Sequence, residues 1–166
     1  MIPSDVIKTT DMISVPIGRW AVAKSPASIR TLLGSCVGIV LHDRQSGLGG
    51  LAHVVLPASR GEADQPGKYA DTAIPAMLAD LERLAGRKLN GRLVAKLLGG
   101  ARMFTGSTGG LDIGQSNRLA TETILAGLGI TVVARDLGGD AGRNIVLSTQ
   151  SGVVQVKVPG GQSYEI

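Results

Sequence analysis

Residues 33 to 56 read Leu33-Gly34-Ser35-Cys36-Val37-Gly38-Ile39-Val40-Leu41-His42-Asp43-Arg44-Gln45-Ser46-Gly47-Leu48-Gly49-Gly50-Leu51-Ala52-His53-Val54-Val55-Leu56. Two apolar runs, 37–41 and 48–56, flank the polar segment 44–47, which ends in glycine. Runs of β-branched and aliphatic residues that are separated by turn residues are typical of two antiparallel strands. The stretch therefore predicts a β-hairpin.

The rest of the chain adds two helices and further strands to this hairpin. Apolar residues recur at helical spacing in residues 68–87 and about 114–128, which predicts two helices. Pro75 lies inside the first helix and is expected to bend it or shift its start. Apolar runs predict strands at residues 19–23, 28–33, 92–98, 130–134, 144–148 and 153–158. Because hairpins prevail over strict strand–helix alternation, the pattern favours the α+β class.

Length and composition indicate one globular domain. We expect a flexible N-terminal lead-in over residues 1–15, one domain over residues 16–158 and a C-terminal tail over residues 159–166. Only 2% of the 166 residues are aromatic and no zinc-finger or phosphate-loop pattern occurs, so nucleic acid binding is not favoured. No apolar run is long enough to span a membrane, and one cysteine cannot form an internal disulfide. A cytoplasmic protein without direct membrane insertion is expected.

Cys36 and His53 are brought together by the predicted hairpin. A turn centred between Arg44 and Gln45 places Cys36 opposite His53, where the two Cβ atoms would be about 4.5–5.5 Å apart. A register slip or a bulge at Gly49-Gly50 would change this pairing. The other histidine, His42, lies six residues from Cys36 along the strand, about 20 Å away, and is a poor base for it.

The residue types suit nucleophilic catalysis. An imidazole beside a thiol can take its proton to give a thiolate–imidazolium pair, which attacks carbonyl carbons. Backbone N–H groups around Gly34 and Ser35 could stabilise the developing oxyanion, and Thr31 or a nearby carbonyl could orient the imidazole of His53. A buried structural cysteine and a structural strand histidine would give the same pattern. Spacing alone therefore leaves both interpretations open.

Several segments in a fixed order resemble a known family. Thr31-Leu32-Leu33-Gly34-Ser35-Cys36-Val37 and Gly50-Leu51-Ala52-His53-Val54-Val55-Leu56-Pro57 resemble the signature of the CheD family, the chemoreceptor glutamine deamidases of bacterial chemotaxis. Similar blocks follow at Lys68-Tyr69-Ala70-Asp71-Thr72-Ala73, Gly99-Gly100-Ala101-Arg102-Met103-Phe104, Ile113-Gly114 with Asn117, and Gly138-Gly139-Asp140-Ala141-Gly142-Arg143. The resemblance covers about residues 15 to 158. Arg19 departs from it, since family members often carry an acidic residue there.

The resemblance implies a fold, a reaction and partners. It implies a sandwich of mixed β-sheets flanked by two main helices, similar to toxin-type cysteine deamidases of bacteria. Cys36 would be the nucleophile, His53 the general base and Thr31 the third catalytic residue, without a metal or an organic cofactor. The implied substrates are glutamine side chains on the cytoplasmic helices of methyl-accepting chemoreceptors. A CheC-type phosphatase is a further partner that the resemblance allows.

Two other functions remain open at this point. The domain could be a non-catalytic adaptor that binds chemoreceptors or a CheC-type phosphatase without turnover. It could also be an amidase that hydrolyses free glutamine or simple amides.

Overall fold

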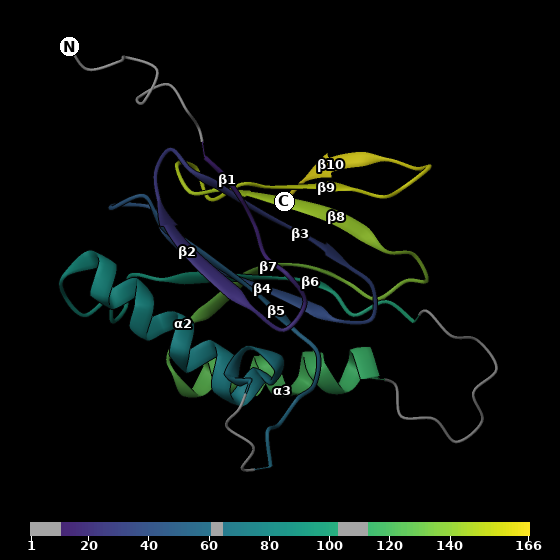
Figure 1. Cartoon of the computed structure of the whole chain (residues 1–166), viewed down its shortest axis with the longest axis horizontal. Helices are drawn as coiled ribbons and strands as arrows, with labels where there is room; N and C mark the ends of the chain where they lie inside the picture. Colours follow the sequence, from purple (N-terminus) through teal and green to yellow (C-terminus); the bar gives the residue numbers. More distant parts are fainter. Residues whose placement is uncertain (1–10, 61–64, 103–112) are drawn as a thin grey trace.

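The predicted hairpin lies in the middle of a five-stranded sheet, here called sheet B (Figure 1). The computed structural model describes residues 11–60, 65–102 and 113–166. Strands β4 and β5 form the hairpin, and sheet B has the order β2-β5-β4-β6-β7 with only β6 and β7 parallel. The strands are β2 (Trp20–Lys24), β4 (Val37–Asp43), β5 (Leu48–Val54), β6 (Val94–Gly99) and β7 (Thr131–Leu137).

A second five-stranded sheet, sheet A, packs on one face of sheet B and has the order β1-β3-β8-β9-β10. Its strands are β1 (Met12–Ser14), β3 (Ser28–Leu33), β8 (Arg143–Ser148), β9 (Val154–Lys157) and β10 (Ser163–Glu165). Strand β1 lies within the expected lead-in, whose first ten residues are outside the described part of the chain, and β10 lies within the expected tail. Both segments therefore contribute edge strands to sheet A.

Two helices cover the other face of sheet B (Figure 1). A short 3-10 helix, η1 (Pro66–Lys68), precedes α2 (Ala70–Ala85), and α3 (Ile113–Gly127) follows β6. Helix α2 ends where Gly86 adopts the left-handed conformation, and it contains Pro75. Among the described residues, neither helix combines the length and hydrophobicity that crossing a membrane requires.

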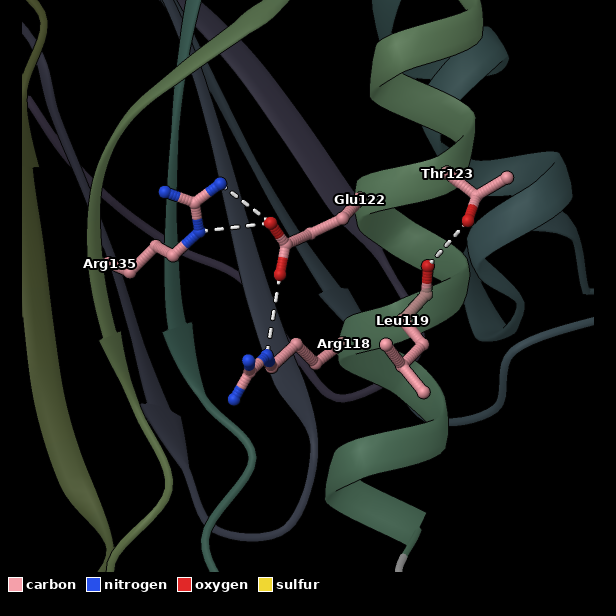
Figure 2. Close-up of polar contacts among 5 residues, drawn as sticks. All are labelled: Arg118, Leu119, Glu122, Thr123 and Arg135. Atoms are coloured by element: carbon pink, nitrogen blue, oxygen red, sulfur yellow. Dashed lines mark hydrogen bonds and ion pairs between the residues drawn. The ribbon is translucent and has the colours of Figure 1, made fainter.

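Helix α3 is tied to the edge strand β7 by a charged cluster, which Figure 2 shows. Glu122 of α3 pairs with Arg135 of β7 at 2.6 Å and with Arg118 of its own helix at 3.3 Å. The hydrogen bonds from Arg135 hold the pKa of the Glu122 carboxyl below its usual range. The next residue, Thr123, donates its hydroxyl hydrogen to the Leu119 carbonyl one turn earlier in the helix. The Glu122–Arg135 pair therefore fixes α3 against sheet B.

The three-layer arrangement explains why β4 and β5 are buried along their whole length. Alternate residues of a strand point to opposite faces of the sheet. Ile39 and Leu41 pack in the core beneath the helices, whereas Val40 packs in the core between the sheets. On β5, Ala52 belongs to the helix-side core and Leu51 to the core between the sheets. Sheet B is therefore the central layer of the molecule.

The hairpin register differs from the expectation by two residues. Residue 53 pairs with Gly38 instead of Cys36, because four residues, 44–47, connect the strands. The Asp43 carboxylate stabilises this longer loop by accepting hydrogen bonds from the Gln45 amide at 3.1 Å and the Ser46 hydroxyl at 2.7 Å. A shift of two residues preserves the face to which each side chain points. Cys36 and His53 therefore still point to the same face of sheet B.

Candidate active site

Thr31, Cys36 and His53 meet at one end of the space between the two sheets. Thr31 lies on β3 of sheet A, His53 lies on β5 of sheet B, and Cys36 lies in the turn that carries the chain from β3 to β4. All three line one cavity of about 570 Å³. The cavity is lined by Val15, Ile17, Thr31, Leu32, Leu33, Gly34, Ser35, Cys36, His53 and Gly142. The structure thus brings together all five residues that the sequence predicts for the site.

The Thr31 hydroxyl is in direct contact with the imidazole. Thr31 Oγ1 is 2.8 Å from His53 Nδ1, and the same hydroxyl donates to the Val15 carbonyl at 2.8 Å. Because a hydroxyl has a single proton, its oxygen is left to accept a hydrogen bond from Nδ1–H of His53. This arrangement assigns the proton of the neutral imidazole to Nδ1. The Nε2 atom is then the basic nitrogen.

Burial sets the protonation of the two reactive groups. It lowers the pKa of His53 to about 4 and raises the pKa of the Cys36 thiol. Both effects disfavour charge, because a low-dielectric site penalises an imidazolium and a thiolate alike. The resting thiolate–imidazolium pair that the residue types suggest is therefore disfavoured. The structure favours a neutral thiol beside a neutral imidazole at neutral pH.

Cys36 and His53 are diagonal neighbours across the hairpin. His53 pairs with Gly38, and Cys36 lies two residues before Gly38. Diagonal positions in an antiparallel pair are about 7–8 Å apart and stay within reach of long side chains. The side chains of Leu33 and Ile145 pack against Gly38, where a Cβ would lie 2.8 Å from the Leu33 side chain. The expected direct opposition of Cys36 and His53 is wrong, although both still line the cavity.

The turn that contains Cys36 rests on the end of β6. The Gly100 amide donates to the Cys36 carbonyl at 2.8 Å, and the Ala101 amide donates to the Gly34 carbonyl at 3.0 Å. Gly99 has a φ of 95°, and a Cβ there would collide with the Cys36 carbonyl oxygen. The small residues at 99–101 leave room for this close packing. Their neighbour is the turn that contains Cys36.

Sequence reasoning missed several residues of the cavity wall. Val15 accepts the hydrogen bond of Thr31, Ile17 lies at the rim, and Gly142 approaches from the loop between β7 and β8. Gly142 belongs to the segment 138–143, which resembles a block of the CheD family. That resemblance was the signal in the sequence that could have placed Gly142 near the site. Val15 and Ile17 carry no comparable signal because an aliphatic residue near a strand end has no specific chemistry. Within the described ranges, no three His, Cys, Asp or Glu side chains are grouped for metal binding.

Comparisons with known proteins identify the family. A family model described as CheD chemotactic sensory transduction matches residues 55–158. The chain is 46% identical over 147 residues to the probable chemoreceptor glutamine deamidase CheD of Methanococcus vannielii, a match that covers 88% of this chain and 94% of the relative. It is 42% identical over 154 residues to the chemoreceptor glutamine deamidase CheD of Thermotoga maritima, covering 92% of this chain and 96% of the relative.

A third relative extends the comparison and bears on the candidate site. The probable chemoreceptor glutamine deamidase CheD of Archaeoglobus fulgidus is 46% identical over 151 residues, which cover 90% of this chain and 94% of the relative. The family model begins after His53, but spans this long must include residues 31 to 53. The sequence blocks, the two-sheet fold and these relatives agree, and the chain belongs to the CheD family.

Proposed function

We propose that this protein is a chemoreceptor glutamine deamidase. The observation that carries the proposal is the Thr31–His53 hydrogen bond of 2.8 Å in the cavity that also contains Cys36. A nucleophile, a base and a group that orients the base form the usual unit of amide hydrolysis through a covalent intermediate. The names of the relatives, which describe chemoreceptor glutamine deamidases, support the same reaction.

In the first step the Cys36 thiol attacks the substrate. A glutamine side chain enters the cavity with its carboxamide carbon next to Sγ, and His53 Nε2 takes the thiol proton as the S–C bond forms. Starting from two neutral groups avoids a charged resting pair in an apolar cavity, and the charge develops only during attack. Thr31 retains the proton on Nδ1 and stabilises the imidazolium while it exists.

The oxyanion is proposed to be stabilised by backbone amides of the turn Gly34-Ser35-Cys36 between β3 and β4, here called the nucleophile turn after the proposed role of Cys36. The carbonyl of Gly34 points toward Ala101, with which it is hydrogen-bonded. In a trans peptide the N–H points away from the preceding carbonyl, so the Ser35 amide points away from residue 101. The Ser35 amide is thus our candidate oxyanion donor, together with that of Cys36.

The second half of the reaction releases the products. His53 gives its proton to the departing nitrogen, ammonia leaves, and a thioester joins Cys36 to the substrate. His53 then takes a proton from water, whose oxygen attacks the thioester, and the returning proton restores the Cys36 thiol as glutamate leaves. Each turnover adds one negative charge to the substrate. A charge added to a finely balanced helical bundle can shift its conformational equilibrium.

The substrate is proposed to be a folded receptor segment and not free glutamine. Ile17 and Leu32 line the cavity and are 63% and 60% exposed. Large aliphatic side chains that are this exposed beside a nucleophile provide an apolar surface for a polypeptide flanking the target residue. The cytoplasmic helices of methyl-accepting chemoreceptors are the proposed substrate, and a cytoplasmic location follows from it.

The test is a deamidation assay on a purified receptor cytoplasmic fragment with the wild-type protein and Cys36→Ala. Peptide mass spectrometry should detect glutamine-to-glutamate conversion with the wild type and none with Cys36→Ala. Conversion of free glutamine at a comparable rate would instead identify a small-molecule amidase. Binding of the fragment without conversion by either protein would contradict the proposal and favour the adaptor function.

We also propose a CheC-type phosphatase as a second partner, which the family resemblance supports. Co-elution of the two purified proteins in size-exclusion chromatography is the expected result. Independent elution at micromolar concentrations would count against this partner.

A further inference from the structure

Arg143 is a buried charged residue that the proposed chemistry does not use. It begins β8 and is only 6% exposed. Its guanidinium donates to the Asp136 carbonyl at 2.5 Å, to the Gly138 carbonyl, and to the Ala141 carbonyl at 3.5 Å. The guanidinium therefore binds carbonyls of the last residues of β7 and of the loop that follows, here together called the loop 136–142.

The loop that Arg143 organises is hydrogen-bonded to the segment that supports the nucleophile turn. The Gly138 amide donates to the Gly99 carbonyl at 2.9 Å, and the Arg102 amide donates to the Gly139 carbonyl at 2.8 Å. The next amide after Gly99, that of Gly100, donates to the Cys36 carbonyl. Hydrogen bonds therefore connect Arg143 to Cys36 through two short segments, 136–142 and 99–102.

The same loop also contributes directly to the cavity. Gly142 lines the cavity, and a Cβ at Gly142 would lie 3.0 Å from the Leu33 carbonyl oxygen. Leu33 immediately precedes the Gly34-Ser35-Cys36 turn and pairs with Arg143 across the β3–β8 ladder. A displacement of the loop would therefore reach the nucleophile turn from two directions.

Arg143 is held in place by a further pair of side chains that joins the two sheets. Its guanidinium is 3.4 Å from the Asp136 carboxylate, and the Tyr164 hydroxyl donates to that carboxylate at 2.6 Å. Asp136 lies on β7 of sheet B and Tyr164 on β10 of sheet A. The charge of Arg143 is thus compensated, which a buried guanidinium requires.

We propose that Arg143 is a positioning residue that fixes the nucleophile turn, acting through the loop 136–142 and the β6 end 99–102. A planar guanidinium presents five N–H donors in a fixed fork that spans several converging carbonyls, whereas a lysine ammonium is a compact point charge with three donors on a single nitrogen. The glycines at 138 and 139, with φ of 87° and 75°, give the loop the conformation in which its carbonyls converge. The inference that this turn is catalytic rests on the proposed function.

Arg92 provides a matched control within the same chain. It is also a largely buried arginine paired with an aspartate, Asp43, at 2.8 Å, and in both arginines the buried Nε has no partner among the described residues. Asp43, however, ends β4 at the hairpin loop, about 20 Å along the strand from Val37. Arg92→Lys should therefore resemble Arg143→Lys in its cost to folding but not in its effect on the site.

The experiment compares Arg143→Lys, Arg92→Lys and the wild type in two assays, at temperatures well below unfolding. Arg143→Lys is expected to lower kcat for receptor deamidation about 10- to 100-fold with little change in KM, because small misplacements of reacting groups cost this much. The rate at which iodoacetamide alkylates Cys36 should instead rise in Arg143→Lys. A displaced turn exposes the thiol to water, relieves the burial that raises its pKa, and so speeds alkylation at neutral pH.

The two assays together distinguish a positioning role of Arg143 from a purely structural one. Slower deamidation with faster alkylation in Arg143→Lys but not in Arg92→Lys supports the proposal, whereas equal behaviour of the two variants in both assays overturns it. Alkylation needs no substrate, so it tests the positioning role even if the wild type proves not to be a deamidase. If Arg143→Lys does not fold, Tyr164→Phe takes its place in both assays. This substitution removes one hydrogen bond to Asp136. It should then show smaller changes of the same signs, and unchanged alkylation would overturn the proposal.

Discussion

At the residue scale, one hydroxyl group decides how the imidazole can act. Thr31 donates to the Val15 carbonyl and accepts from Nδ1 of His53, so that Nε2 keeps the free lone pair. His53 is in turn kept neutral by burial, which lowers its pKa to about 4. The site therefore contains an imidazole that is unprotonated at neutral pH.

The role of Thr31 can be tested by removing its hydroxyl and retaining its shape. Thr31→Val is expected to lower kcat about 10- to 100-fold, a part of the roughly 10²–10⁴-fold that a positioned base contributes. Thr31→Ser retains the hydroxyl and should keep most of the activity. Steady-state deamidation kinetics check both variants, and equal losses would assign Thr31 a packing role.

The pKa of His53 also predicts how stability depends on pH. The unfolded chain takes up the imidazole proton near pH 6.5 and the folded chain near pH 4, so the unfolded state binds more protons between these values. The free energy of unfolding should therefore fall as the pH falls from about 6.5 to about 4, by about 3 kcal/mol from this group. Urea denaturation at a series of pH values measures the fall.

His53→Gln is the control for that titration. His42, whose pKa is also lowered by burial, still titrates in this variant, so the difference between the two proteins isolates His53. A pH dependence that is the same in both proteins would show that His53 does not contribute.

At the element scale, the nucleophile turn depends on the backbone at the end of β6. Gly99 combines a positive φ with direct contact against the Cys36 carbonyl, and Gly100 donates to that carbonyl. The length of the β4–β5 loop matters equally, because it pairs His53 with Gly38. Both features depend on the contacts between elements and not on the secondary structure of each element alone.

Alanine substitutions at two glycines with positive φ distinguish the cost of backbone strain from the cost of a steric collision. Gly91 has a φ of 73°, and a Cβ there would have no atom within 4 Å among the described residues other than Gly91 itself and its two chain neighbours. Gly99 has both a positive φ and the Cys36 carbonyl beside it. Gly91→Ala should cost about 1–2 kcal/mol of stability and leave kcat unchanged. Gly99→Ala should cost more and also lower kcat. Thermal unfolding and deamidation rates measure these effects, and an unchanged kcat in Gly99→Ala would contradict the support role of β6.

At the scale of the whole molecule, the site is an opening between two packed sheets. Thr31 comes from sheet A and His53 from sheet B, and the exposed side chains of Ile17 and Leu32 border the cavity. The helices lie on the opposite face of sheet B, so they do not cover this end (Figure 1). A protein substrate can therefore approach the cavity along its apolar rim.

The rim is expected to contribute to substrate affinity more than to chemistry. Leu32→Gln and Ile17→Gln should each raise KM for a receptor fragment about tenfold, which corresponds to roughly 1.4 kcal/mol, with kcat nearly unchanged. Val133→Gln is the control, because Val133 is 53% exposed on β7 and does not line the cavity. A KM that rises equally in all three variants would remove the specific role of the rim.

The β4–β5 hairpin shows which features the local sequence pattern predicts and which it does not. The apolar runs and the polar segment between them correctly predicted two antiparallel strands, and the helices and most other strands lie close to their expected positions. The register was wrong because the segment 44–47 is compatible with a two-residue or a four-residue turn. The side-chain bonds of Asp43 that select the longer loop are not visible in a hydrophobic pattern.

The sequence by itself determined the class of fold, the family and the residue types of the site, because periodicity and ordered motifs are properties of the chain. It also determined that Cys36 and His53 share a face, since a two-residue shift preserves alternation. Only the tertiary structure decided that Thr31 contacts Nδ1 of His53, that burial keeps thiol and imidazole neutral, and that Arg143 is linked to the nucleophile turn. These features depend on how sheet A packs on sheet B, and that packing joins residues far apart in the chain.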